Sequence, residues 1–281
     1  MMLDHGCVGR FVGTAIFLAC IFVSGCANLT ASPTERADTL AQQNGFVNVP
    51  LQSGLHAYWR TQSSSATAPE LTIYIEGDGA HWPRGLPPAD PTPINPYALK
   101  LAIADTTSNV AYLGRACQYL PASELAKCPL ALWTDARFGD DAITSMSRSI
   151  DEIKTKSKAK SLRLVGYSGG GTLAVLVLAK RLDVSCLVTV AAPLDTETWA
   201  ATLGVSPLKN SHNPALDMDS TSEFRQTHFQ GGADAVVPPS TTLAFRSRHP
   251  TAKFVLDENY DHECCWDKQW AQRIAAACPS L

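Results

Sequence analysis

The pattern of apolar and polar residues predicts strands and helices that alternate along most of the chain. Apolar and β-branched runs bounded by Gly, Pro or polar residues predict strands at 46–49, 55–59, 71–75, 110–113, 161–166, 186–191, 227–230 and 252–256. Helices are predicted at 98–104, 140–156, 171–181 and 266–277, and the spacing of Ile143, Met146, Ile150 and Ile153 is helical. Because the later strands are continuously apolar, we expect an α/β fold with a mostly parallel central sheet and helices on both faces.

Composition agrees with one folded domain, which we place at 46–281. The chain has 281 residues, of which 45% are hydrophobic and 17% are charged. We find no internal repeat and no second domain. The net charge of −3 and the lack of a basic stripe give no reason to expect nucleic acid as a partner. The lysines between 154 and 160 are expected to be the solvated end of a helix.

The N-terminus predicts export. Arg10 precedes an apolar run at 11–23 that is too short to span a bilayer comfortably and suits a secretory signal. The segment Val23-Ser24-Gly25-Cys26 resembles the lipobox of bacterial lipoproteins. This resemblance implies a signal peptide at 1–25, lipidation of Cys26 and a membrane tether at 26–45. With Ala27 rather than Asp after the cysteine, it implies the outer membrane, facing the periplasm. A plain signal peptide cleaved nearby is the alternative.

Cysteine usage is consistent with an oxidising compartment. Of nine cysteines, Cys7 and Cys20 leave with the signal and Cys26 carries lipid. The six that remain are Cys117, Cys128, Cys186, Cys264, Cys265 and Cys278. An even number of cysteines in an exported chain predicts disulfides.

Two pairings are expected among these six. Cys117 and Cys128 lie in one predicted loop and are the favoured pair. One of Cys264 or Cys265 is expected to bind Cys278. Metal binding is the alternative, but the chain has no CxxC pair, so we expect no metal. Without a Gly-rich phosphate loop we expect no nucleotide and no other cofactor.

The segment Gly166-Tyr167-Ser168-Gly169-Gly170 lies between the predicted strand 161–166 and the predicted helix 171–181. Such a tight strand–turn–helix needs small residues two positions before and after the serine, and it exposes the serine hydroxyl above the sheet edge. The Gly169 N–H, at the positive end of the helix, can then bind an oxyanion. Ser168 is therefore the candidate nucleophile.

A serine nucleophile needs a base, and four histidines follow it: His212, His228, His249 and His262. His262 lies just past the last predicted strand, in a loop that opens at the catalytic edge of a parallel sheet. His228 is within a strand and His249 precedes the last strand, at the opposite edge. His262 is therefore favoured, with His212 as the alternative.

The acid is expected at Asp234, in the loop after strand 227–230. The stretch Gly231-Gly-Ala-Asp-Ala-Val-Val-Pro238 resembles the G-x-x-D-x-V-V-P segment of many α/β hydrolases. Asp234 would orient the imidazole and stabilise the imidazolium. Asp195, after the preceding strand, is the alternative.

The loop after strand 71–75 is expected to supply the second oxyanion donor. It reads Glu76-Gly77-Asp78-Gly79, and the Asp78 N–H, directly after the glycine, is the favoured donor. A carboxylate is unexpected beside a developing negative charge. The residues expected to line the pocket from this sheet edge are His81, Trp82, Arg115 and Tyr119.

From about residue 46 onwards the chain resembles the α/β-hydrolase superfamily. More narrowly, it resembles poorly characterised exported bacterial members that share the Ile-Glu-Gly-Asp-Gly turn, an Arg-x-Cys-Gln-Tyr loop at 115–119 and Asn213-Pro214. The superfamily resemblance implies a Ser-Asp-His triad and an acyl-enzyme. The segment 194–224 stands where relatives insert a lid. It is short and polar, which predicts a small or partly polar acyl substrate.

We therefore expect a serine hydrolase of carboxylic esters, of carboxylesterase type. A serine peptidase or an acyltransferase on the same triad is the first alternative. A non-catalytic envelope binding module is the second.

Overall fold

Strands of the central sheet contribute apolar side chains to both of its faces. In β3 (Glu70–Ile75), Ile73 and Ile75 belong to one core cluster and Tyr74 to the other. In β5 (Ser161–Tyr167), Leu164 faces the first cluster and Val165 the second. Successive side chains of a strand point to opposite faces, so a continuous apolar run requires cover on both sides.

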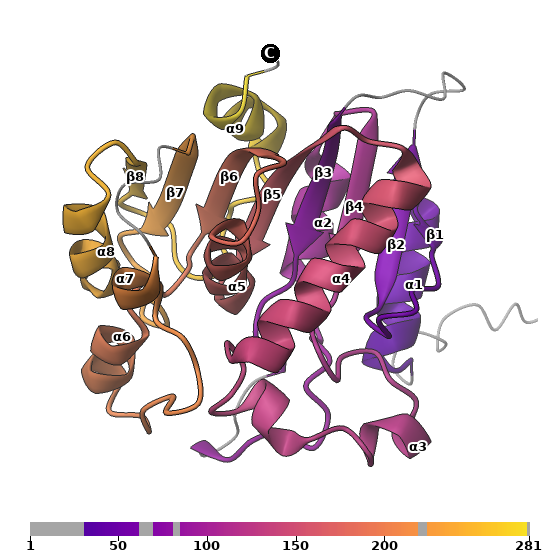
Figure 1. Ribbon diagram of the computed structural model, residues 1–281, viewed down its shortest axis with the longest axis horizontal. Coiled ribbons are helices and arrows are strands. Elements are labelled where there is room, and N and C mark those ends of the chain that lie inside the picture. The colour runs from indigo at the N-terminus through magenta and orange to yellow at the C-terminus, as the bar shows by residue number, and fades with distance from the viewer. Residues whose placement is uncertain (1–30, 62–69, 81–84, 219–223, 280–281) are drawn as a thin grey trace, which may run out of the picture. The chain divides into compact units, whose positions relative to one another are not determined.

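The computed structural model describes residues 31–61, 70–80, 85–218 and 224–279 (Figure 1). Within them the sheet has eight strands in the order β1-β2-β4-β3-β5-β6-β7-β8. The β1–β2 and β2–β4 pairs are antiparallel and the others are parallel. The remaining strands are β1 (Val47–Asn48), β2 (Ala57–Thr61), β4 (Asn109–Leu113), β6 (Val184–Val190), β7 (Gln226–Gly231) and β8 (Lys253–Asp257). The expected mostly parallel sheet is confirmed.

Helices cover both faces of the sheet (Figure 1). One face packs against α4 (Asp140–Ser157), α5 (Gly169–Leu178), α7 (Pro214–Asp217) and α8 (Leu243–Arg248). The other packs against α1 (Pro33–Gln43), α2 (Tyr97–Ala104) and α9 (Trp270–Ala277). The shorter elements are α3 (Ala122–Leu125), α6 (Thr196–Leu203) and the 3₁₀ turns η2 (Leu130–Trp133) and η3 (Pro239–Thr242). No helix in the described residues is long and apolar enough to cross a membrane.

Helix α1 occupies residues that we expected to belong to the tether. It opens with a capping box in which Ser32 Oγ accepts from Glu35 N at 3.2 Å and Glu35 Oε2 accepts from Ser32 N at 2.7 Å. Ala37 and Ala41 are fully buried in the second core cluster. The expected domain boundary at residue 46 is therefore too late, since the compact unit starts at Ser32. The expected signal peptide and Cys26 lie outside the described residues.

Three disulfides lie in the described part of the chain, and one expected pairing is wrong. Cys117 and Cys128 form the favoured pair. Cys278 binds Cys186 rather than Cys264 or Cys265, which bind each other. Cys186 lies on β6 and Cys278 directly follows α9, both in the second core cluster. That packing brings their Cα atoms to 5.9 Å, a separation that the sequence does not show.

Candidate active site

Ser168 occupies a sharp turn between β5 and α5. Its backbone has φ 50° and ψ −127°, a conformation that residues other than glycine rarely adopt. The turn requires glycine at 166, because a Cβ there would lie 2.3 Å from the Gly170 carbonyl oxygen. The Ser168 N–H donates to the Val190 carbonyl at 2.8 Å, which ties the turn to the end of β6. The serine is thus fixed at the carboxyl edge of the sheet.

A hydrogen-bonded relay connects Ser168 to two residues from later loops. His262 Nε2 lies 3.1 Å from Ser168 Oγ, and His262 Nδ1 lies 2.9 Å from Asp234 Oδ2. Asp234 Oδ1 accepts the N–H groups of Val236 at 2.8 Å and Val237 at 2.7 Å. The Asp234 side chain is fully buried and that of His262 is 16% exposed. The carboxylate is therefore held by backbone donors while it faces the imidazole.

Aromatic residues hold the His262 loop in place. The Tyr167 hydroxyl donates to the His262 carbonyl at 3.0 Å, and Trp266 Nε1 donates to the same oxygen at 3.1 Å. Trp266 is fully buried. Because Tyr167 directly precedes Ser168, the loop that carries the imidazole is anchored to the turn that carries the serine.

The other histidines that follow Ser168 lie elsewhere. His212 Nε2 lies 3.1 Å from Asp140 Oδ1 at the start of α4. His228 is buried in β7 and shares hydrogen bonds with Thr189 and Gln226. Burial lowers the pKa of His228 to about 3. His249 is buried beside Phe245. Of the four, the structure brings only His262 to Ser168.

Asp195, the alternative acid, serves as the N-cap of α6. It accepts from Thr198 N at 3.2 Å, from Thr198 Oγ1 at 2.6 Å and from Asn213 Nδ2 at 3.0 Å. These bonds satisfy the hydrogen-bonding capacity of the Asp195 carboxylate. Burial raises the pKa of Asp195, but the hydrogen bonds outweigh burial and lower the pKa below its ordinary value. The structure therefore places Asp234, not Asp195, against the imidazole.

The loop that follows β3 packs directly on Ser168. A Cβ added to Gly77 would lie 3.3 Å from Ser168 Cβ. Among the described residues, neither the Asp78 N–H nor the Gly169 N–H has a hydrogen-bond acceptor. Two unsatisfied amides beside a serine hydroxyl are the arrangement that binds an oxyanion.

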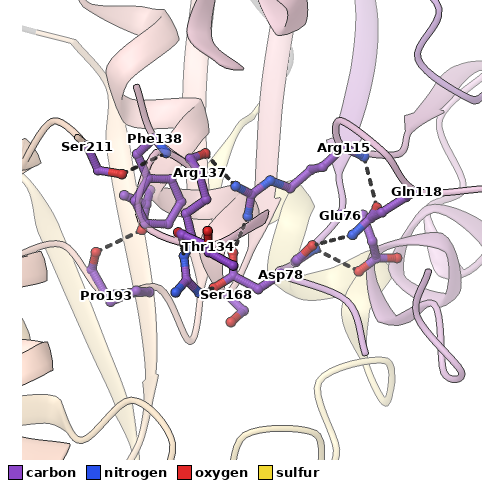
Figure 2. A network of polar contacts seen from close by, with 12 residues as sticks. Glu76, Asp78, Arg115, Gln118, Thr134, Arg137, Phe138, Ser168, Pro193 and Ser211 are labelled. Carbon is purple, nitrogen blue, oxygen red and sulfur yellow. Dashed lines mark hydrogen bonds and ion pairs between the residues drawn. The ribbon is translucent and has the colours of Figure 1, made fainter. Parts of the chain in front are cut away.

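The Asp78 carboxylate is paired with two arginines, which resolves the difficulty that a carboxylate poses at this place. Asp78 Oδ1 binds Arg115 Nη1, and Asp78 Oδ2 lies 2.7 Å from Arg137 Nη1 (Figure 2). Burial raises the pKa of Asp78, but Arg137 and Arg115 outweigh it and lower the pKa below its ordinary value. The carboxylate is thus a neutralised member of a cluster with net positive charge.

Arg115 and Tyr119, which we expected to line the pocket, are instead buried. They are 5% and 6% exposed. The Tyr119 hydroxyl lies 2.6 Å from that of Tyr112, which donates to Glu76 Oε2 at 3.0 Å. Both residues therefore support the loop after β3 through buried contacts, Arg115 with Asp78 and Tyr119 with Glu76 through Tyr112. His81 and Trp82 lie outside the described residues.

The segments 76–79 and 115–119 bind each other along their length. Gln118 Nε2 donates to the Gly77 carbonyl at 3.0 Å, and its Oε1 accepts from Arg115 N at 2.9 Å. Glu76 Oε1 accepts from Gly77 N at 2.9 Å, and burial raises the pKa of Glu76 to about 7. The conformation of the loop after β3 is therefore set by contacts from the 115–119 segment.

Sequence reasoning missed Arg137, which completes the cluster around Asp78. It lies in an unpredicted stretch between η2 and α4, 59 residues from its partner, so no local pattern marks it. Among the described residues, no group of His, Cys, Asp or Glu is arranged to hold a metal ion.

No protein-family model and no curated protein matches the chain. Solved structures do match. A putative dienelactone hydrolase from Klebsiella pneumoniae has a TM-score of 0.56 at 17% identity, over 84% of this chain and 98% of its own. An esterase from Pyrococcus furiosus has a TM-score of 0.55 at 13% identity, over 83% and 88%. An α/β serine hydrolase without a lid from Xanthomonas campestris has a TM-score of 0.51 at 13% identity, over 84% and 95%. At these identities the likeness establishes the α/β-hydrolase fold.

Proposed function

We propose that this protein is a serine hydrolase that cleaves carboxylic esters through an acyl-enzyme. The relay from Ser168 through His262 to Asp234, with contacts of 3.1 Å and 2.9 Å, carries this proposal. Each link has the length that proton transfer or imidazole orientation requires. The two unsatisfied amides beside the serine add the second element of acyl-transfer chemistry.

In the first half of the reaction, Ser168 Oγ attacks the acyl carbonyl carbon while His262 Nε2 accepts its proton. Asp234 keeps the remaining imidazole proton on Nδ1 and stabilises the imidazolium. The carbonyl oxygen becomes an oxyanion, which the N–H groups of Gly169 and Asp78 bind. When the tetrahedral intermediate collapses, the ester C–O bond breaks and His262 donates its proton to the leaving alcohol.

In the second half, water attacks the acyl-enzyme and His262 Nε2 accepts a proton from it. The second tetrahedral intermediate uses the same two amides. Its collapse breaks the bond to Ser168 Oγ, which regains a proton from His262, and releases the carboxylic acid. The same base, His262, therefore serves both halves of the reaction.

An ester is the proposed substrate class, with a small or partly polar acyl group. The short polar segment 194–224 contains only the brief helices α6 and α7 in its described part. Esterases are among the solved structures that the fold resembles, but so is an acylaminoacyl peptidase from Pyrococcus horikoshii, of which this chain spans 39%. Hydrolysis of matched ester and amide substrates separates the two, and an added alcohol acceptor reveals acyl transfer.

The test is a panel of p-nitrophenyl esters of increasing acyl length, assayed with wild type and Ser168→Ala. We expect turnover on the shorter esters, labelling of the wild type by a fluorophosphonate probe, and neither in Ser168→Ala. Folded wild type that reacts with no ester, amide or fluorophosphonate would support a non-catalytic binding module instead. Turnover by Ser168→Ala at the wild-type rate would reject the nucleophile.

We also propose that the chain is exported and lipid-anchored to the cell envelope through Cys26. Three disulfides in the described residues suit an oxidising compartment. Expression in a bacterium fed labelled palmitate tests the anchor. Label on the wild type and none on Cys26→Ser is expected, whereas an unlabelled but processed wild type indicates a plain signal peptide.

A further inference from the structure

We infer that Arg115 and Arg137 are positioning residues, which act through the Asp78 carboxylate to hold both oxyanion-binding amides of the proposed site. The inference rests on the proposed function, and it assigns a role to the ion cluster that adjoins Ser168 (Figure 2).

The Asp78 carboxylate is a bridge whose two oxygens are used separately. One oxygen binds Arg115 and the other binds Arg137. The two arginine side chains are 6% and 7% exposed, and that of Asp78 is 26% exposed. Buried charges of this kind need complete pairing, and paired charge-assisted hydrogen bonds are strong and directional. The carboxylate therefore has one orientation.

Both arginines are themselves fixed to the segment that precedes α4. Arg115 Nη2 donates to the Arg137 carbonyl at 2.6 Å, and its guanidinium lies 5.0 Å from the centre of the Phe138 ring. Arg137 Nε donates to the Thr134 carbonyl at 2.7 Å. The loop after β3 is thereby tied, through Asp78, to a different part of the chain.

The cluster also contacts the other oxyanion donor. A Cβ at position 169 would lie 2.0 Å from Asp78 Oδ1 and 2.6 Å from Arg115 Nη1. Position 169 must therefore be glycine, because the ion pair of Asp78 and Arg115 packs directly against the first residue of α5. The ion cluster therefore acts on both proposed oxyanion donors. It fixes the side chain of Asp78, whose N–H is one donor, and it packs against the backbone of Gly169, whose N–H is the other.

The net charge of the cluster and the hydrogen bonds that already occupy Arg115 distinguish this positioning role from substrate binding. The cluster has two cations and one anion, so its net charge is positive where the transition state becomes negative. Both Nη groups of Arg115 are already bound to protein. A residue that stabilises only the transition state changes kcat, whereas a residue that binds an anionic substrate in the ground state changes KM.

The experiment compares Arg137→Gln, Asp78→Asn and the double variant with wild type. Its readouts are kcat and KM on one ester and the rate of fluorophosphonate labelling. Displacing oxyanion donors by a fraction of an ångström costs about 10- to 100-fold. We expect kcat and the labelling rate to fall by about that factor in each single variant, with KM nearly unchanged. Because both changes break the same contact, the double variant should be no slower than the slower single variant.

Two further variants separate positioning from general loss of structure. Arg137→Lys keeps the positive charge but loses the planar guanidinium group, so its kcat should lie between those of Arg137→Gln and wild type. Arg163→Gln is the matched control. It removes an arginine of β5 whose side chain is also 7% exposed and pairs with Glu70 of β3. It should lower thermal stability without lowering kcat.

The outcomes separate this inference from the proposed function. If folded wild type fails to react with the fluorophosphonate, the proposed function fails and this inference falls with it. If wild type reacts, then undiminished kcat in the single variants, additive losses in the double variant, or a rise in KM alone overturns this inference only. If Arg137→Gln does not fold, the nearly isosteric Asp78→Asn decides by its kcat alone.

Discussion

Replacing Asp234 by Asn is the sharpest test of the relay, because the structure dictates how the new side chain must sit. Two backbone N–H groups, of Val236 and Val237, donate to Asp234 Oδ1 at 2.8 and 2.7 Å. The amide oxygen of Asn has to take that place, since an NH2 group there would face two donors. Its NH2 then lies against His262 Nδ1, at the position of an oxygen that is now 2.9 Å away.

This orientation selects the wrong tautomer of the imidazole. An Asn NH2 donates, so His262 Nδ1 has to accept and the ring proton moves to Nε2. Nε2 is the atom that lies 3.1 Å from Ser168 Oγ and is proposed to take its proton. Restoring the productive tautomer requires flipping the amide, which turns its NH2 group toward the N–H groups of Val236 and Val237 and removes their acceptor, at about 1–3 kcal/mol each. The penalty is about 2–6 kcal/mol, or about 30- to 10⁴-fold in kcat.

The assay is steady-state hydrolysis of a p-nitrophenyl ester, with thermal unfolding measured in parallel to show that the variant is folded. The matched control is Asp195→Asn, because Asp195 is the other acid that follows a strand of the sheet. It caps α6, and Asn caps a helix about as well as Asp, so kcat should change by less than about twofold. A large loss in Asp195→Asn, or wild-type kcat in Asp234→Asn, would refute the reasoning.

Three other predictions follow from the packing. Gly169→Ala should lower kcat by about 100-fold or more in the same assay, because its Cβ would lie 2.0 Å from Asp78 Oδ1. Replacing Cys186 and Cys278 together by Ala should lower the free energy of unfolding in urea by about 4 kcal/mol, since the disulfide closes a loop with a sequence separation of 92. Burial lowers the pKa of His228 from 6.5 to about 3, so the unfolded chain binds the extra proton between these values. Stability should therefore fall as the pH drops below 6.5, by up to about 1.4 kcal/mol per pH unit, and His228→Gln should flatten this dependence in pH-dependent thermal melts.

Much of the fold is predictable because its signals are local. The strand at 161–166 and the helix at 171–181 flank the serine turn and appear as β5 and α5, within a few residues. Helix α1 was not predicted because it fully buries only Ala37 and Ala41, and most of its other residues, apart from Pro33 and Leu40, are polar. Pairing of Cys278 was predicted wrongly because it depends on where α9 docks against β6, a contact between residues 92 positions apart.

The residues of the candidate site also differ in whether local signals in the sequence predict them. Ser168, Asp234 and His262 could each be chosen from their place after a predicted strand, because parallel strands bring their carboxyl ends to one edge. The setting of Asp78 could not be predicted, since its partners Arg115 and Arg137 are 37 and 59 residues away. Isolated in the sequence, the carboxylate conflicts with oxyanion binding, and only the two guanidinium groups remove that conflict.

The segment 115–119 shows how the support of the proposed oxyanion loop depends on a covalent bond. Cys117 and Tyr119 have φ values of 69° and 62°, where residues other than glycine cost about 1–3 kcal/mol each. The Cys117–Cys128 disulfide and the hydrogen bond between the Tyr119 and Tyr112 hydroxyls hold this unfavourable backbone in place. Gln118, which binds the loop after β3, lies between these two residues, and Arg115, which binds the same loop, is two positions before Cys117. Reduction of the disulfide should therefore loosen the proposed oxyanion donors before it affects the sheet, so that activity is lost at a lower concentration of reductant than folding is.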